Sequence, residues 1–195
     1  PILLAWDGQT RAVFTVGDSL KVDSAPAIAK FRKFGITPWL ISGDSLQAAN
    51  TIAQEAGIAT ENIRAAVLPD QKVDAIKELQ SQGHHVLMIG DGVNDAAALA
   101  TADLSMAMGT GTDTAIAVAD ITLIRSDLTS AITALKLSRK TLRIIKGNLA
   151  WAFAYNVIGI PIAAAGLLSP MYAGAAMALS SIFVVTNSLR LRNFK

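Results

Sequence analysis

The segment MIGDGVNDAAAL (Met88–Leu99) decides the fold class of this chain. An apolar run at 85–90 ends in glycines and two aspartates, Asp91 and Asp95, and a helix-forming stretch follows directly. A helix that starts just after a strand offers free N–H groups and a positive dipole end to anions. Mg²⁺ takes one or two carboxylates together with phosphate oxygens and water. Taken alone, the two aspartates fit such a site and fit a strand end with a helix cap equally well.

On both sides of this segment, apolar runs alternate with amphipathic stretches over most of the chain. The runs predict strands at 12–16, 37–42, 64–67, 85–90, 104–108 and 121–124, and the amphipathic stretches predict helices at 24–34, 45–56, 70–81, 94–101 and 112–118. This alternation predicts an α/β fold with a Rossmann-like parallel sheet. Ligands of such sheets bind at the carboxyl ends of the strands, where SGD (42–44) and GDGVND (90–95) both lie.

The last third of the chain has a different composition. Residues 147–189 carry no charged side chain, a run too long for one membrane helix of about 20 residues and suited to two. We expect a transmembrane hairpin in 147–195, with helices at about 148–168 and 171–189 around Ser169-Pro170. A basic connecting helix at 128–146 precedes it, and a soluble domain fills 1–127. Lys and Arg flank both outer ends, which predicts that both ends face the cytoplasm.

Charge is divided in the same way. Residues 1–127 hold nine Lys/Arg and all fifteen Asp/Glu, whereas 128–195 hold eight Lys/Arg and no acidic residue. The basic character therefore belongs to the membrane-flanking tail, which argues against a nucleic-acid partner. The absence of cysteine excludes disulfides and thiolate metal sites from this chain. The beginning, PILLAWDG, is not a signal peptide and reads as a piece of something longer.

Further polar residues join Asp91 and Asp95 as candidates for a phosphate site. Ser42, Gly43 and Asp44 end an apolar run with a hydroxyl and exposed amides, although this is also ordinary turn composition. Lys72 follows LPDQ at a helix start and could reach a phosphate as a point charge, although a solvated lysine is the commoner case. Gly90 and Gly92 allow a close backbone approach to a ligand, and Asn94 adds an amide.

These elements, in this order, resemble the haloacid dehalogenase superfamily and, within it, the P-type ATPases. SGD (42–44), LPDQK (68–72) and GDGVNDAAAL (90–99) resemble the T-G-D, the lysine and the G-D-G-x-N-D-A-P-A-L of their phosphorylation domain. Ser42 occupies the position where the family has Thr, and Ala97 the position where it has Pro. VGDSLK (16–21) resembles the family's D-P-x-R/K segment, with Ser19 in place of Pro. The resemblance implies that Asp91 binds Mg²⁺ with support from Asp95 and Asn94. It also implies that Ser42, Gly43 and Lys72 hold the phosphoryl group while Asp44 orients the loop.

The D-K-T-G-T segment that supplies the family's aspartyl nucleophile does not occur in this sequence. Neither Asp7 nor Asp18 is followed by Lys-Thr-Gly, and the nucleotide-binding domain that binds most of the ATP is also missing. We therefore expect the chain alone to form no phosphoenzyme and to hydrolyse no ATP.

Polar groups in the uncharged run are functional candidates. Tyr155 and Asn156 lie in the first predicted span, and Met177, Ser180 and Ser181 share a helix face in the second. A thioether suits Cu(I). Core filling by Met, back-bonded Ser and small-residue helix packing explain the same residues without an ion.

A Y-N followed by M-x-x-S-S in the last span resembles the copper-exporting branch of the heavy-metal P-type ATPases, as do GIPIAAAG (159–166) and VVTNSLRLRNF (184–194). The resemblance implies a Cu(+) site lined by Tyr155, Asn156, Met177 and Ser181, with Ser180 beside them. It implies ATP and Mg²⁺ as cofactors and a multi-pass membrane protein, in the cell membrane, with cytoplasmic phosphorylation domain and C-terminus. Its expected partners are membrane lipid, the transported metal ion, the remainder of the pump and a copper chaperone.

Three alternatives stay open: a pump for another heavy metal, a membrane-tethered phosphatase of the same superfamily, and a non-catalytic metal-binding or regulatory membrane protein. The residues encoded upstream separate the classes. D-K-T-G-T with C-P-C indicates the pump, D-x-D alone indicates the phosphatase, and a start codon near Pro1 indicates the non-catalytic protein.

Overall fold

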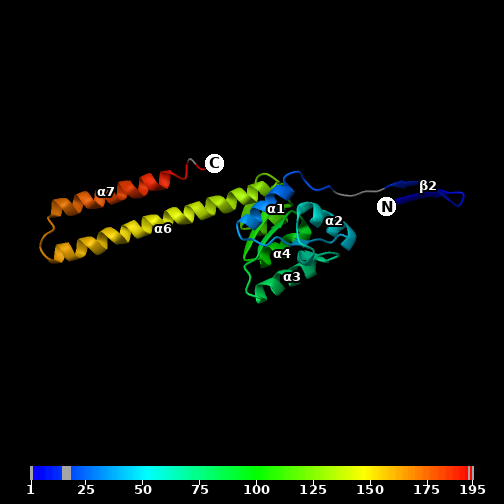
Figure 1. Cartoon of the computed structure of the whole chain (residues 1–195), viewed down its shortest axis with the longest axis horizontal. Helices are drawn as coiled ribbons and strands as arrows, with labels where there is room; N and C mark the ends of the chain where they lie inside the picture. Colours follow the sequence, from blue (N-terminus) through cyan, green and yellow to red (C-terminus); the bar gives the residue numbers. More distant parts are fainter. Residues whose placement is uncertain (1, 15–18, 193, 195) are drawn as a thin grey trace. The chain divides into compact units, whose positions relative to one another are not determined.

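The computed structural model describes residues 2–14, 19–192 and 194. The chain forms two compact units, Pro1–Ile132 and Thr133–Lys195. The first holds the strands and short helices, and the second is helical (Figure 1). An α/β fold with parallel strands followed by two long apolar helices confirms the predicted fold class.

The first unit begins with an antiparallel hairpin of β1 (Ile2–Trp6) and β2 (Gln9–Phe14). Asp7 and Gly8 form its turn with φ of 54° and 71°. Positive φ at both positions is what a two-residue type I′ hairpin turn requires, and Asp-Gly is a favoured pair for it. The sequence pattern predicted a strand at 12–16 but did not predict β1. Leu3, Leu4, Trp6, Val13 and Phe14 are all exposed large apolar side chains.

The parallel strands form two small sheets. In one, β3 (Leu40–Ile41) pairs with β4 (Ile63–Arg64), and in the other the order is β5 (Leu87–Gly90), β6 (Leu104–Met108), β7 (Ile121–Leu123). The middle strand β6 has the most continuous burial, with Ser105, Met106 and Ala107 almost inaccessible. The parallel pairing confirms the alternating strand–helix interpretation, because parallel neighbours need crossover connections. Of the predicted strand 12–16, residues 15 and 16 lie outside the described part.

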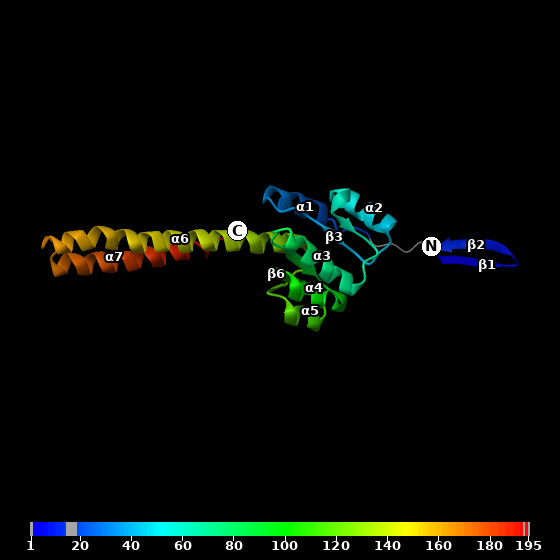
Figure 2. The same cartoon turned by 90° about the horizontal axis from the view of Figure 1, so that it is seen from below.

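Short helices connect these strands. They are α1 (Ser24–Lys33), α2 (Leu46–Ala56), α3 (Pro69–Ser81), α4 (Ala96–Thr101) and α5 (Asp113–Val118), with 3-10 turns η1 (Thr60–Asn62) and η2 (Val93–Asp95). The Ser45 hydroxyl caps α2 by accepting from the Ala48 N–H, and Gly57, with φ of 76°, ends it. α1 packs on α2, α3 on α4, and α4 on α5 (Figure 2).

Small side chains dominate the core of the first unit. Its buried apolar residues include eight alanines: Ala27, Ala49, Ala53, Ala56, Ala98, Ala107, Ala115 and Ala131. Leu99, Ala107 and Ala115 form one cluster, with Met88, Ile116 and Ala119 packed against it. Short side chains let α4 and α5 approach β6 closely, so the carboxyl end of β5 is held by tightly packed neighbours.

Two aspartates fasten the β5–β6–β7 sheet. The Asp120 carboxylate accepts from both the N–H and the hydroxyl of Ser105, at 2.8 Å each. These bonds hold the pKa of Asp120 below its usual value. The pKa of Asp103 is lowered in the same way, first by the Val86 N–H at 2.8 Å and then by the Gln80 amide. Both carboxylates therefore serve the sheet in their ionised form.

The second unit contains most of α6 (Leu128–Ala164) and all of α7 (Pro170–Leu189). α6 is unbroken, so the predicted connecting helix and the first predicted span are one helix, which ends at Ala164 rather than near 168. Ser169 and Pro170 start α7, as the sequence indicated. The two helices lie side by side in both views (Figures 1 and 2). Each is long and apolar enough to cross a membrane.

Candidate functional site

Asp95 is the buried member of the GDGVND segment. It lies at the end of η2, directly after β5, and only 8 % of its surface is exposed. A Cβ on Gly90 would lie 2.9 Å from the Asp95 Cβ and 3.0 Å from its Oδ2, so only glycine fits there. The Gly92 N–H points to the same Oδ2 at 3.4 Å. Gly90 therefore makes room for the carboxylate, and Gly92 points a backbone N–H at it.

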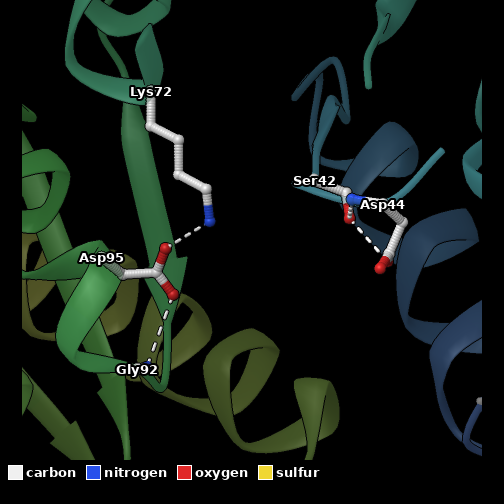
Figure 3. A network of polar contacts seen from close by, with 5 residues as sticks. All are labelled: Ser42, Asp44, Lys72, Gly92 and Asp95. Atoms are coloured by element: carbon white, nitrogen blue, oxygen red, sulfur yellow. Dashed lines mark hydrogen bonds and ion pairs between the residues drawn. The ribbon is translucent and has the colours of Figure 1, made fainter. Parts of the chain in front are cut away.

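Lys72 is the partner of that carboxylate. It lies in the first turns of α3, and its Nζ is 2.7 Å from Asp95 Oδ1 (Figure 3). The side chains are 15 % and 12 % exposed, so this ion pair is largely shielded from water. Charge-assisted hydrogen bonds of this length are among the stronger polar contacts in proteins. The structure thus brings together two of the predicted site residues, from segments 23 positions apart.

Ser42 and Asp44 form a second polar pair, at the carboxyl end of β3. The Ser42 hydroxyl donates to Asp44 Oδ2 at 2.8 Å and accepts from the Asp44 N–H at 3.1 Å (Figure 3). The backbone is tied to the segment after β4, because the Ala66 N–H donates to the Asp44 carbonyl at 2.7 Å. Gly43 lies between them, and a Cβ there would meet only the Val67 carbonyl, at 3.4 Å. No hydrogen bond joins this pair to Lys72 or Asp95 in the described part of the chain.

Asp91 is exposed at the end of β5, and its backbone is held from behind by the loop after β6. The Thr112 N–H donates to the Asp91 carbonyl at 3.1 Å. A Cβ on Gly111 would lie 2.8 Å from the same oxygen, so the loop needs glycine to approach. The Asn94 side chain is exposed nearby in the sequence. Asp91 thus has a fixed backbone and a carboxylate open to a ligand.

These residues fit the predicted Mg²⁺ ion. The described residues contain no group of three or more His, Asp or Glu side chains that could enclose a metal by themselves. Mg²⁺ does not require one, because it is usually held by one or two carboxylates with waters and substrate phosphates. The exposed Asp91 offers a free carboxylate of the kind that Mg²⁺ takes, whereas Asp95 already shares its Oδ1 with Lys72.

The candidate residues of the apolar helices divide between two environments. Ser180 is buried and Tyr155 is half-buried. Asn156, Met177 and Ser181 are exposed, Met177 at 63 %. The Asn156 amide donates to the Ala152 carbonyl at 2.7 Å, and the Ser181 hydroxyl donates to the Met177 carbonyl at 3.2 Å. These last two side chains therefore bond to their own helix, and the described residues do not enclose a site.

A polar cluster at the start of α6 was not predicted from the sequence. The Thr110 and Ser126 hydroxyls are 2.6 Å apart, and Lys21 Nζ donates to the Ser126 carbonyl at 3.1 Å. Asp127 caps the helix through the Ser130 N–H at 2.6 Å, and its hydrogen bonds to Ser130 lower its pKa. An aspartate just before a helical stretch is a helix-start signal that could have been found. Of the VGDSLK segment, 16–18 lie outside the described residues.

Comparisons with known proteins agree with this arrangement. A sequence profile described as "Hydrolase: haloacid dehalogenase-like hydrolase" matches residues 2–103. The chain is 51 % identical over 193 residues to the cation-transporting P-type ATPase B of Mycobacterium tuberculosis (strain ATCC 25618 / H37Rv), covering 99 % of this chain and 25 % of that protein. It is also 51 % identical over 194 residues to the copper-exporting P-type ATPase of Bacillus subtilis (strain 168), covering 100 % of this chain and 24 % of that protein.

A solved structure extends the likeness to both units. The crystal structure of a zinc-transporting PIB-type ATPase in its E2.Pi state superposes with a TM-score of 0.82 at 33 % identity. It covers 90 % of this chain and 28 % of that one. The chain thus spans about a quarter of the length of the relatives that it matches. The chain belongs to the haloacid dehalogenase-like hydrolase family and, within it, to the heavy-metal P-type ATPases, which are membrane proteins.

Proposed function

We propose that the chain is the C-terminal part of an ATP-driven pump that exports Cu(+) and couples turnover of an aspartyl phosphate to metal translocation. The observation that carries the proposal is the shielded Lys72–Asp95 pair beside Asp91, at the carboxyl end of β5. A lysine held in this way presents a fixed positive charge where a phosphoryl group is to be bound. The same chain carries two helices suited to a membrane.

In the phosphoryl site, each residue acts from the position that the structure gives it. Lys72 neutralises charge on the phosphoryl oxygens, and Asp95 keeps its Nζ in place through the 2.7 Å contact. The Gly43 N–H binds a phosphoryl oxygen, and the Ser42 hydroxyl does so by turning its proton from Asp44 Oδ2, 2.8 Å away, to the phosphoryl group. Asp91 would hold Mg²⁺ with support from Asp95 and Asn94. When bound, Mg²⁺ supplies charge neutralisation at the transferring group.

The two parallel sheets favour a nucleophile supplied by the rest of the pump. β3 pairs only with β4, and β5 pairs only with β6, among the described residues. Each therefore has one edge with unpaired backbone groups, next to Ser42 and Asp91 respectively. A parallel strand placed between β3 and β5 would extend both sheets. Its carboxyl end would then lie beside Ser42 and Asp91. In our proposal that strand carries the aspartate that is phosphorylated.

Cu(+) is the proposed cargo, carried past Tyr155, Asn156, Met177, Ser180 and Ser181. The Met177 thioether favours a soft monovalent ion. The Bacillus subtilis relative is named a copper-exporting P-type ATPase, which supports the same metal. Because Met177 is largely exposed, it can face ligands from further spans of the whole pump. The solved zinc-transporting relative favours the second candidate, a pump of this type for another heavy metal.

The proposed orientation places both ends of the helical pair in the cytoplasm. Lys and Arg lie before α6 becomes uncharged and after α7 ends, at Lys146 and Arg190 among others. This is the distribution of the positive-inside rule. The first unit and the C-terminus then share the compartment that supplies ATP and a copper chaperone.

The experiment that tests the proposal uses the full-length pump in lipid vesicles. ATP hydrolysis and metal uptake are measured with Cu(I), Ag(I) and Zn(II) under reducing conditions. We expect stimulation by Cu(I) and Ag(I), with a vanadate-sensitive and acid-stable phosphoenzyme. Stimulation by Zn(II) alone would contradict Cu(+) as the cargo and support the second candidate, a pump for another heavy metal. Phosphatase activity without any metal dependence would refute transport altogether.

A further inference from the structure

A cluster of three side chains joins α6 to α7 across the second unit. The Asn148 amide donates to the Ser188 hydroxyl at 3.1 Å, and Asn148 Oδ1 accepts from the Asn187 amide at 2.7 Å. Arg190 donates to Asn187 Oδ1 at 3.4 Å. Asn148, Asn187 and Ser188 are half-buried. One asparagine on α6 thus exchanges hydrogen bonds with two successive residues of α7, and we call these three residues the amide clamp.

The amide clamp lies at the edge of the uncharged part of both helices. Asn148 is the second residue of the run 147–189, and Ser188 is its last but one. Gly147 precedes Asn148, and a Cβ there would meet the Asn187 amide nitrogen at 3.9 Å. In lipid, two apolar helices are not driven together by the hydrophobic effect, so packing and hydrogen bonds decide their association. At this position the clamp supplies directional bonds to an otherwise apolar contact.

The rest of the contact between α6 and α7 does little to fix their register. Trp151 and Phe183 stack at 4.9 Å between ring centroids, and Ala152 and Val184 line one shallow apolar groove beside Asn148. Apolar contacts of this kind tolerate a shift of one helix along the other. Hydrogen bonds do not, because a shift of one turn is about 5.4 Å and breaks them.

The register that the clamp selects has a consequence for the candidate metal residues. Tyr155 is seven residues after Asn148, and Ser180 is seven residues before Asn187. Seven residues are close to two helical turns, so each lies on the same helix face as its clamp residue, about 10 Å further along. The burial agrees, since Tyr155 is half-buried and Ser180 is buried. The clamp therefore holds Tyr155 and Ser180 level with each other.

We infer that Asn148, Asn187 and Ser188 are positioning residues that fix the register of α6 against α7 and thereby the depth of the intramembrane metal residues. The part concerning metal rests on the proposed function. The register itself does not depend on which metal is carried, or on whether one is carried.

Disulfide trapping tests the register in the chain reconstituted in lipid. The chain has no cysteine, so introduced thiols are its only ones. Ala152→Cys with Val184→Cys reports the observed register, and Ala152→Cys with Ser180→Cys reports a shift of one turn. With the clamp intact, the first pair forms the disulfide. In Asn148→Leu/Asn187→Leu the ratio of the two products falls by about 10-fold, equivalent to about 1.4 kcal/mol.

The controls separate register from folding. Thr186→Val changes an exposed hydroxyl of α7 and leaves the ratio unchanged. Asn148→Ser/Ser188→Asn exchanges the partners of one bond across the helices and keeps the ratio of the unaltered chain, which a general loss of structure would not allow. An unchanged ratio in Asn148→Leu/Asn187→Leu overturns the inference.

A second readout joins register to metal binding in the full-length pump. Asn148→Leu/Asn187→Leu raises the Cu(I) concentration needed for half-maximal ATP hydrolysis, while phosphorylation by inorganic phosphate is retained. A shifted disulfide ratio with an unchanged Cu(I) response overturns the positioning role. If the unaltered pump shows no response to Cu(I), the proposed function fails, and the disulfide result alone decides the register.

Discussion

Lys72 Nζ lies 2.7 Å from Asp95 Oδ1, and the two side chains are only 15 % and 12 % exposed. Asp95, which the sequence predicts to support Mg²⁺, thus uses one carboxylate oxygen to bind Lys72, which the sequence predicts to bind phosphate. In the proposed site this contact would couple the two ligands, because a Lys72 drawn toward a phosphoryl group would free an oxygen of Asp95 for a neighbouring cation.

Removing one partner of this pair destabilises the first unit. Lys72→Ala leaves the Asp95 carboxylate buried without its counter-charge, and breaking a buried pair in this way costs about 3 kcal/mol. Lys72→Met/Asp95→Asn removes both charges and recovers part of that loss. Urea unfolding of the chain measures both effects. Lys77→Ala, an exposed lysine on the same helix, is the control, and an equal loss there would contradict the explanation.

The loop behind Asp91 tolerates no side chain at its glycines. In Gly111→Ala the new Cβ would lie 2.8 Å from the carbonyl oxygens of Asp91 and Met108, and in Gly109→Ala 2.8 Å from that of Ile124. Backbone atoms must shift in both variants, so we expect a loss of about 1–3 kcal/mol by urea unfolding. Gly43→Ala meets only the Val67 carbonyl, at 3.4 Å, and should lose less. Equal losses at the three positions would refute the packing argument.

The lowered pKa values predict a stability that fails in acid. A folded-state pKa below the ordinary 3.8 means that Asp120 and Asp103 bind protons more readily in the unfolded chain. Their contribution is present above pH 3.8 and is lost as the pH falls from there through the lowered values. In Asp120→Asn the unfolding free energy, followed by circular dichroism, should depend less on pH below 3.8 than in the unaltered chain. Glu55→Gln, an exposed carboxylate on α2, should keep the original dependence.

Met177 provides the sharpest test of the metal. In the full-length pump, Met177→Ala should raise the Cu(I) concentration for half-maximal turnover about 10-fold, because a soft ligand worth about 1.4 kcal/mol is lost. Phosphorylation from inorganic phosphate should persist. Leu179→Ala removes a similarly exposed apolar side chain of α7 and should leave both measurements unchanged. Loss of both activities in Met177→Ala would show that the residue is structural.

The chain by itself should be inactive. It contains no D-K-T-G-T segment, so no aspartate is available in that context to accept the phosphoryl group. The purified chain should release no phosphate from ATP with Mg²⁺, whereas adding a polypeptide that carries the nucleophile strand should restore activity if the edges of β3 and β5 accept it. Vanadate-sensitive hydrolysis by the chain alone would contradict this prediction.

Local patterns predicted most elements of the fold because each carried its own signal. Ser45 and Gly57 bracket α2, and GDGVND marks the turn from β5 to α4. The hairpin of β1 and β2 was not predicted, although Asp7-Gly8 is a strong signal for a two-residue turn.

Pairings between distant segments could not be predicted in the same way. The residues around Lys72 in the sequence do not predict that its partner is Asp95, and those around Asn148 do not predict that its partner is Asn187. Such contacts depend on how helices pack, and one-dimensional periodicity reports only which face is apolar. The roles assigned to the site residues stay predictions, whereas their surroundings are now defined.

The hairpin of β1 and β2 also affects how the protein can be handled. It exposes leucine, tryptophan and phenylalanine side chains on a two-stranded ribbon that pairs with no further strand among the described residues. Ribbons of this kind recruit further strands, from whichever chain offers them. At high concentration the isolated polypeptide should therefore self-associate into β-rich aggregates through residues 2–14, far from its membrane helices in the sequence. A detergent that shields α6 and α7 would not prevent this, whereas a lysine introduced on the ribbon would.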